Sequence, residues 1–262
     1  MNKRHVWAMF RRHWIASIYS PPRLIDMVFW PVVDVVLWGV MTTYLERQNA
    51  QLPIPLSFLL GGLLLWDLVF RSKNGIAVAF LSEGYWRNAI NLLASPLTSA
   101  EYLAGLVLYS LTRTAVSWVL ITALAWTLFS FGVLSFGAIL GTYVVLLLVF
   151  GVAMSFVVLG LVLRFGPAAD EMAWAISGFV APFAAVFYPL AALPGWARAI
   201  AAAMPPAHIF ESMRSVLAGR PALPHELVVA LVLDVIYLAG SVAFANAMFD
   251  LFRRRGYVTR YM

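Results

Sequence analysis

Charged side chains inside long apolar runs are the residues of this sequence whose types and spacing could do chemistry. They are Asp34, Asp67, Arg71, Arg113 and Asp234. Each is costly in hydrocarbon, so each should face protein, water or an opposite charge. Asp67 and Arg71 are spaced i, i+4 and can pair on one face of a helix. Ion pairing within the protein is the first expectation for these residues, and contact with a substrate is the second.

Other chemical motifs are sparse. The chain has no cysteine, which excludes disulfides, thiolate metal sites and cysteine nucleophiles. No G-x-x-x-x-G-K-[ST] phosphate loop is present, so we expect no ATP hydrolysis and no bound cofactor in this chain. The histidines are scattered without metal-ligand spacing, at His5, His13, His208 and His225.

The composition indicates which elements must carry the charged residues. Hydrophobic residues make up 63% of the 262 residues and charged residues 11%, whereas soluble domains are about half apolar and a quarter charged. Apolar runs of roughly 20 residues or more can cross a bilayer, and helices satisfy their backbone there. We therefore predict an all-α polytopic membrane protein, a single domain over 1–262 with six transmembrane helices. The expected spans are 24–44, 56–81, 100–131, 138–163, 172–190 and 227–252.

Basic residues at both ends of the chain predict its orientation. The net charge is +6, and the terminal basic residues flank the first and last spans. Basic flanks stay on the cytoplasmic side, and six spans return the chain to the side from which it started. Both termini are therefore expected in the cytoplasm. No basic face on a soluble domain is present, so we expect no nucleic-acid partner.

The first 22 residues predict an amphipathic helix in the headgroup plane, where membrane lipid is its partner. Trp7, Phe10, Trp14 and Ile18 fall along one helical stripe. A frayed basic tail is the alternative.

A second irregular region, 191–218, precedes the last span on the expected outer side. Its apolar piece, from Trp196 to Met204, is bounded by Pro194-Gly195 and Pro205-Pro206 and is too short to span. We predict a re-entrant helical segment, and an outer loop with surface helices is the alternative.

The stretch "GYWRNAINLLASP" predicts a short cytoplasmic helix over 84–94. Trp86, Ile90 and Leu93 recur on one apolar face, and Pro96 ends the helix. The following "TSAE" reads as a capping box with Thr98 at N-cap and Glu101 at N3. Such a helix can be gripped by a cytoplasmic partner or can rest on lipid headgroups.

These features together resemble the ABC-2 type permeases, the membrane subunits of ABC exporters. The resemblance covers the whole chain, and "LLASPLTSAEYLAG" and "PLAALPGWARAIAAAMPPAHIFESMR" carry it most specifically. It implies a bacterial inner-membrane permease, paired as a homodimer or with a related permease, on a separate ATPase subunit that binds ATP and Mg. The helix over 84–94 would be the coupling helix, with contacts to the ATPase from Tyr85, Trp86, Arg87, Ile90, Leu93 and Pro96.

An amphipathic substrate is expected to move outward, whether a drug-like molecule, a lipid or a lipid-linked glycan. Candidate aromatic residues for its path are Phe29, Tyr143, Phe150 and Tyr188. Two alternatives remain open, a self-sufficient secondary transporter and a membrane scaffold that does not transport. The secondary transporter predicts an internal repeat that the sequence does not show. The scaffold gives Asp67, Arg71 and Arg113 no reason to lie in the membrane.

Overall fold

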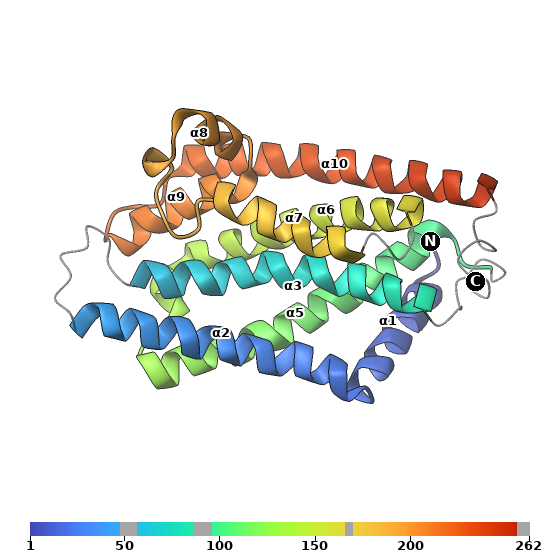
Figure 1. Ribbon diagram of the computed structural model, residues 1–262, viewed down its shortest axis with the longest axis horizontal. Helices are drawn as coiled ribbons and strands as arrows, with labels where there is room; N and C mark the ends of the chain where they lie inside the picture. The colour runs from blue at the N-terminus through green and yellow to red at the C-terminus, as the bar shows by residue number, and fades with distance from the viewer. Residues whose placement is uncertain (48–56, 86–95, 166–169, 256–262) are drawn as a thin grey trace.

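The long helices of the protein lie side by side along its longest axis (Figure 1). The structure is a computed structural model that describes residues 1–47, 57–85, 96–165 and 170–255. Within those residues the chain is helical and contains no strand. The longest helices are α2 (Pro21–Arg47), α3 (Ser57–Tyr85), α5 (Ser99–Phe129), α6 (Leu140–Phe165) and α10 (Pro224–Arg255).

Four candidate membrane spans have the length and composition needed to cross a bilayer, among the residues described. They are α2, α5, α10 and the combined segment of η1 (Val133–Ile139) and α6. The protein is therefore a multi-pass membrane protein. Helix α3 is 29 residues long, but Asp67, Arg71 and Lys73 interrupt its apolar run. Helix α7 (Asp170–Phe183) has 14 residues, about 21 Å of helix against a hydrocarbon core of about 30 Å.

The fifth expected span is shorter than the sequence predicted. It was expected to continue to Leu190, but α7 ends at Phe183. Pro182 lies in its last turn, and Ala185 adopts a positive φ of 53°, which a helix cannot contain. The remaining apolar residues up to Leu190 therefore form a turn and not another length of helix.

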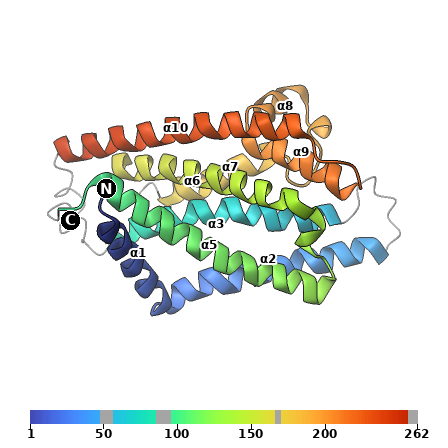
Figure 2. The ribbon, with the colours of Figure 1, turned by 180° about the vertical axis from the view of Figure 1, so that it is seen from behind.

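The helices alternate in direction, which brings the N-terminus and the end of α10 to the same end of the bundle (Figures 1 and 2). Helix α1 (Lys3–Ile18) crosses this end at a steep angle and packs on α5. The expected interface helix over 1–22 is thus shorter, because α2 already begins at Pro21. Proline is favoured in the first turn of a helix, where its missing N–H needs no partner.

The face of α1 that packs on the bundle overlaps the aromatic stripe only in part. Met9, His13 and Ser17 are the buried residues of α1, and Ser17 Oγ lies 2.6 Å from the hydroxyl oxygen of Tyr109. Trp7 is 57% exposed and stacks on Phe10. Ile18 is exposed as well, whereas Phe10 and Trp14 are partly buried and pack against the core. The stripe is therefore divided, with its two ends available to lipid and its middle helping to hold α1 on the bundle.

Small residues bring α3 close to α5 and α6. A Cβ on Gly151 would meet Ser72 Oγ at 1.9 Å, and a Cβ on Gly75 would meet Ser110 Oγ at 2.3 Å. Ser110 Oγ donates a hydrogen bond of 2.7 Å to the carbonyl of Ser72. Close approach at small residues, with hydrogen bonds across the contact, is how helices associate in membranes.

Short helices form a cap at the opposite end of the bundle. The segment after α7 folds as η3 (Leu190–Ala192), α8 (Gly195–Ala202) and α9 (Pro205–Leu217), and α9 leads into α10. Glu211 accepts a hydrogen bond from the Leu190 N–H at 2.6 Å, and Arg214 donates to the Ala185 carbonyl at 2.8 Å. These contacts fasten the chain that leaves α7 onto α9.

Candidate functional site

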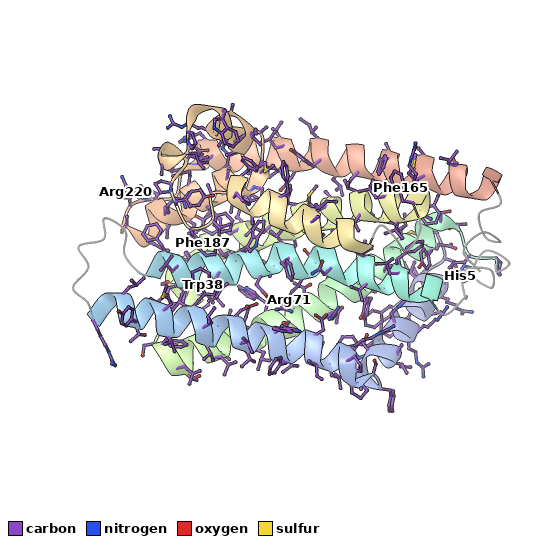
Figure 3. All side chains as sticks on the ribbon, viewed as in Figure 1. His5, Trp38, Arg71, Phe165, Phe187 and Arg220 are labelled. Carbon is purple, nitrogen blue, oxygen red and sulfur yellow. The ribbon has the colours of Figure 1, made fainter. Side chains whose placement is uncertain are left out.

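A cluster of charged residues joins α2, α3 and α5 about midway along the bundle, where Arg71 lies between α2 and α3 (Figure 3). Arg71 Nε donates to the Asp67 carboxylate at 2.7 Å, and both side chains are nearly buried. The predicted i, i+4 pair is therefore confirmed. A second guanidinium nitrogen of Arg71 donates to the backbone carbonyl of Asp26 at 3.2 Å.

The predicted site residue Arg113 pairs with a carboxylate that was not among the predicted site residues. Its guanidinium bonds to Asp26 on α2, and the Arg113 side chain is buried. Asp26 lies inside the first expected span, so the cost of a charge in hydrocarbon applied to it as much as to Asp34. That cost was the signal by which the sequence could have identified it.

Asp34 belongs to the same cluster. It is half-buried on α2, about two helical turns after Asp26, and the charge of Arg71 acts on it. The cluster thus sets Asp26, Asp34 and Asp67 against Arg71 and Arg113. Pairing most of these charges lets them remain in the membrane at a tolerable cost.

A small polar pocket opens beside the two ion pairs. Its lining comes from three helices, with Asp26, Met27, Phe70, Arg71, Asn74, Arg113 and Ser117. Ser117 Oγ also donates to the carbonyl of Met27 at 3.0 Å, and the indole N–H of Trp118 donates to the carbonyl of Leu64 at 2.8 Å. The arrangement holds α2, α3 and α5 together through polar contacts, and a rearrangement of these helices must remake those contacts.

Asp234 lies apart from this cluster, on α10. It is fully buried, and neither carboxylate oxygen has a hydrogen-bond partner among the residues described. The structure therefore brings together four of the five predicted charges, and Asp234 is the exception.

The predicted coupling segment is described only at its borders. Gly84 and Tyr85 end α3 and do not begin a separate helix, which corrects the expected start at Gly84. Trp86, Arg87, Ile90 and Leu93 lie outside the described residues. Pro96 is exposed just before α5.

The capping box that follows this segment is confirmed. The Glu101 N–H donates to Thr98 Oγ1 at 3.3 Å, and the Thr98 N–H donates to Glu101 Oε2 at 3.2 Å. Glu101 also accepts the backbone N–H of Asn2 at 2.6 Å, and His5 Nδ1 lies 3.0 Å from its other oxygen. One carboxylate therefore fixes the start of α5 and the start of α1 together.

The candidate pathway aromatics lie in different surroundings. Phe29 is 52% exposed on α2, whereas Tyr143 and Phe150 are buried in α6. The hydroxyl oxygen of Tyr143 lies 2.9 Å from Ser212 Oγ. Tyr188 is half-buried in the cap, where its hydroxyl donates to the Pro182 carbonyl. The structure does not gather these four side chains around one described cavity.

The described residues contain no group of three or more His, Cys, Asp or Glu side chains placed to hold a metal ion.

Comparison with protein-family models gives a match over most of the chain. The model described as "ABC-2 type transporter" matches residues 4–218, from α1 to the end of α9. Comparison with curated proteins gives no match. The match covers most of the chain, including the ion-pair cluster and the capped start of α5. The protein belongs to the ABC-2 type transporter family, as a membrane-spanning transport permease.

Proposed function

We propose that this protein is the permease subunit of an ATP-driven ABC exporter that moves an amphipathic substrate outward across the bacterial inner membrane. The family match over residues 4–218 carries this proposal. Membrane components of this family generally pair with an ATPase subunit, which would bind ATP and Mg. A homodimer of the permease, or a pair with a related permease, would complete the assembly.

The arrangement of the helices supports a six-span topology. In addition to the four candidate spans, α3 crosses with Arg71 paired to Asp67 and turned to α2. Helix α7 crosses part of the bilayer and continues into the cap. Both termini then lie in the cytoplasm with the 86–95 segment, and α8 and α9 lie on the outer side. Membrane lipid contacts α1 through its exposed apolar side chains, Trp7 and Ile18.

The transport mechanism follows from the connections at the cytoplasmic end. ATP-driven closure of the partner subunits pushes on the 84–94 segment, which leads directly into the capped start of α5. Helix α5 is joined to α2 and α3 through Arg113, Ser117 and Trp118. Displacement of α5 therefore reaches the ion-pair cluster in the membrane.

The test is co-purification of an ATPase with the tagged protein from mild detergent. The wild type is compared with a variant carrying Ile90→Asp and Leu93→Asp. A matched control is Leu134→Asp, because Leu134 is 82% exposed in η1, which follows the end of α5 away from its capped start. We expect the ATPase to accompany the wild type and the control and to be lost from the double variant. A folded wild type without any ATPase would instead favour the secondary transporter or the scaffold.

A further inference from the structure

The cap contains one histidine held between two acceptors. His208 of α9 places Nδ1 at 2.5 Å from Glu226 Oε2, and its Nε2 lies 2.8 Å from the carbonyl oxygen of Ala202. The side chain of His208 is 11% exposed. The imidazole thus connects the last residue of α8 to the first turn of α10, across α9.

The acceptors determine how many protons this ring must carry. A backbone carbonyl oxygen accepts hydrogen bonds and never donates one, so Nε2 must carry a proton to bond Ala202. Glu226 lies in the first turn of α10, where the helix dipole favours an ionised carboxylate. An ionised carboxylate is also acceptor-only, so Nδ1 must carry a proton as well.

Neither neutral form of the ring satisfies this site. If Nδ1 loses its proton, a lone pair faces the carboxylate of Glu226. If Nε2 loses its proton, a lone pair faces the carbonyl of Ala202. Both cases replace a hydrogen bond by contact between two acceptors, and the bond to the charged carboxylate is the stronger of the two.

We propose that His208 and Glu226 form a proton-binding site that fastens the outer cap, with one bound proton holding α8 and α9 against α10. With the proton bound, both hydrogen bonds form and the cap is closed. When the external solution removes the proton, one bond is lost and the C-terminal end of α8 is released. The exposure of this site to the external solution depends on the proposed topology, whereas its need for a proton does not.

The other charged groups of α8 and α9 are engaged elsewhere. Arg214 of α9 pairs with Glu211 at 3.1 Å, and Arg198 of α8 donates to the carbonyls of Ala191 and Leu193. On α10, His225 Nε2 lies 3.3 Å from Glu226 Oε1, and its side chain is 71% exposed. His225 is the one further titratable group that contacts the carboxylate among the residues described.

The substitution Glu226→Gln separates this proposal from a simple loss of contact. A glutamine can turn its amide group so that its NH₂ donates to an unprotonated Nδ1, while Nε2–H still bonds Ala202. Both hydrogen bonds of His208 then form with a neutral imidazole. Glu226→Gln should therefore keep the cap closed and remove its dependence on pH, whereas His208→Ala should leave the cap open at every pH.

Cysteine labelling measures the opening of the cap, because the chain has no cysteine of its own. Ala201 on α8 is fully buried, and Ala203 beside it is exposed. Ala201→Cys is labelled with a membrane-impermeant maleimide on intact cells, and Ala203→Cys corrects for the effect of pH on thiol reactivity. Labelling of Ala203→Cys from outside also tests the topology independently. A wrong topology can therefore be distinguished from a cap that does not depend on the His208–Glu226 proton-binding site.

Between about pH 6 and pH 9 we expect the corrected labelling of Ala201→Cys to rise roughly tenfold, as the loss of one charged hydrogen bond implies. Glu226→Gln should hold it low throughout, His208→Ala should hold it high, and His225→Ala should leave the rise intact. Labelling independent of pH with His208 and Glu226 in place would overturn the proposal. So would the same rise with pH in Glu226→Gln.

Discussion

The carboxylate of Glu101 accepts the backbone N–H of Asn2 at 2.6 Å, although the two residues are 99 positions apart in the chain. The same carboxylate closes the capping box with Thr98 at the start of α5. Helix α1 and the residues that follow the 86–95 segment are therefore fixed by one side chain. A movement of this segment that displaces Thr98 must also displace α1 or break these hydrogen bonds.

Substitutions of Thr98 and Glu101 should therefore differ in how many contacts they remove. Thr98→Val removes the cap hydroxyl alone and should lower the free energy of unfolding by about 1 kcal/mol. Glu101→Ala should lower the stability further, because it also frees the Asn2 N–H and His5. In addition, Glu101→Ala should make residues at the start of α1 sensitive to protease, which Thr98→Val should not.

Thermal unfolding in detergent and limited proteolysis measure these two effects. His5→Ala is the intermediate control, since it removes one contact to Glu101 and leaves the capping box intact. Equal protease sensitivity in Thr98→Val and Glu101→Ala would show that the link to Asn2 does not hold α1 in place.

The ion-pair cluster predicts an asymmetry between single and double substitutions. Arg71→Met leaves the Asp67 carboxylate, whose side chain is 8% exposed, without its guanidinium. We expect a loss of about 3 kcal/mol, the usual cost of breaking a buried pair from one side. Adding Asp67→Asn should restore part of that loss, because the uncompensated charge is then absent.

Chemical unfolding of the detergent-solubilised protein measures both values. Arg220→Met is a suitable control, because Arg220 is exposed at the end of the cap, and it should change stability little. If the double variant is as unstable as Arg71→Met, the unpaired charge of Asp67 is not the cause of the lost stability.

The extent to which sequence predicted these features depends on how local they are. The capping box of Thr98 and Glu101 and the pair of Asp67 with Arg71 each lie within one helical turn, so spacing alone revealed them. The pair of Arg113 with Asp26 joins residues 87 positions apart, and no periodicity encodes such a contact.

The ends of the helices are likewise harder to predict where distant residues contribute to them. The start of α2 at Pro21 was not predicted, although the fixed φ of proline favours it there, and the end of α7 at Phe183 was not predicted from the apolar run that continues beyond it. The turn that follows is held by Arg214, which bonds the Ala185 carbonyl and lies 29 positions further along the chain. Composition indicated that the run belonged in a membrane protein, but it could not indicate where the chain would turn.

Burial of His13 against α5 predicts a dependence of stability on pH. Burial, together with the smaller effect of the nearby charges of Arg12 and Arg23, lowers the pKa of His13 from its ordinary value of 6.5 to about 4. The ring contacts Tyr109, with the two ring centres 5.5 Å apart. In the folded protein His13 thus stays neutral at pH values where an unfolded chain would already bind a proton.

The direction of the effect follows from this difference in proton binding. Between the ordinary pKa of 6.5 and the folded value of about 4, the unfolded chain binds more protons, so stability falls as the pH falls. The contribution is fully present above that window, and at about pH 5 the loss amounts to about 2 kcal/mol. His13→Gln cannot take up a proton and should lack this part of the decline. Unfolding midpoints of both proteins at about pH 7 and pH 5 measure the difference, and the same decline in both would mean that His13 is already accessible to protons in the folded state.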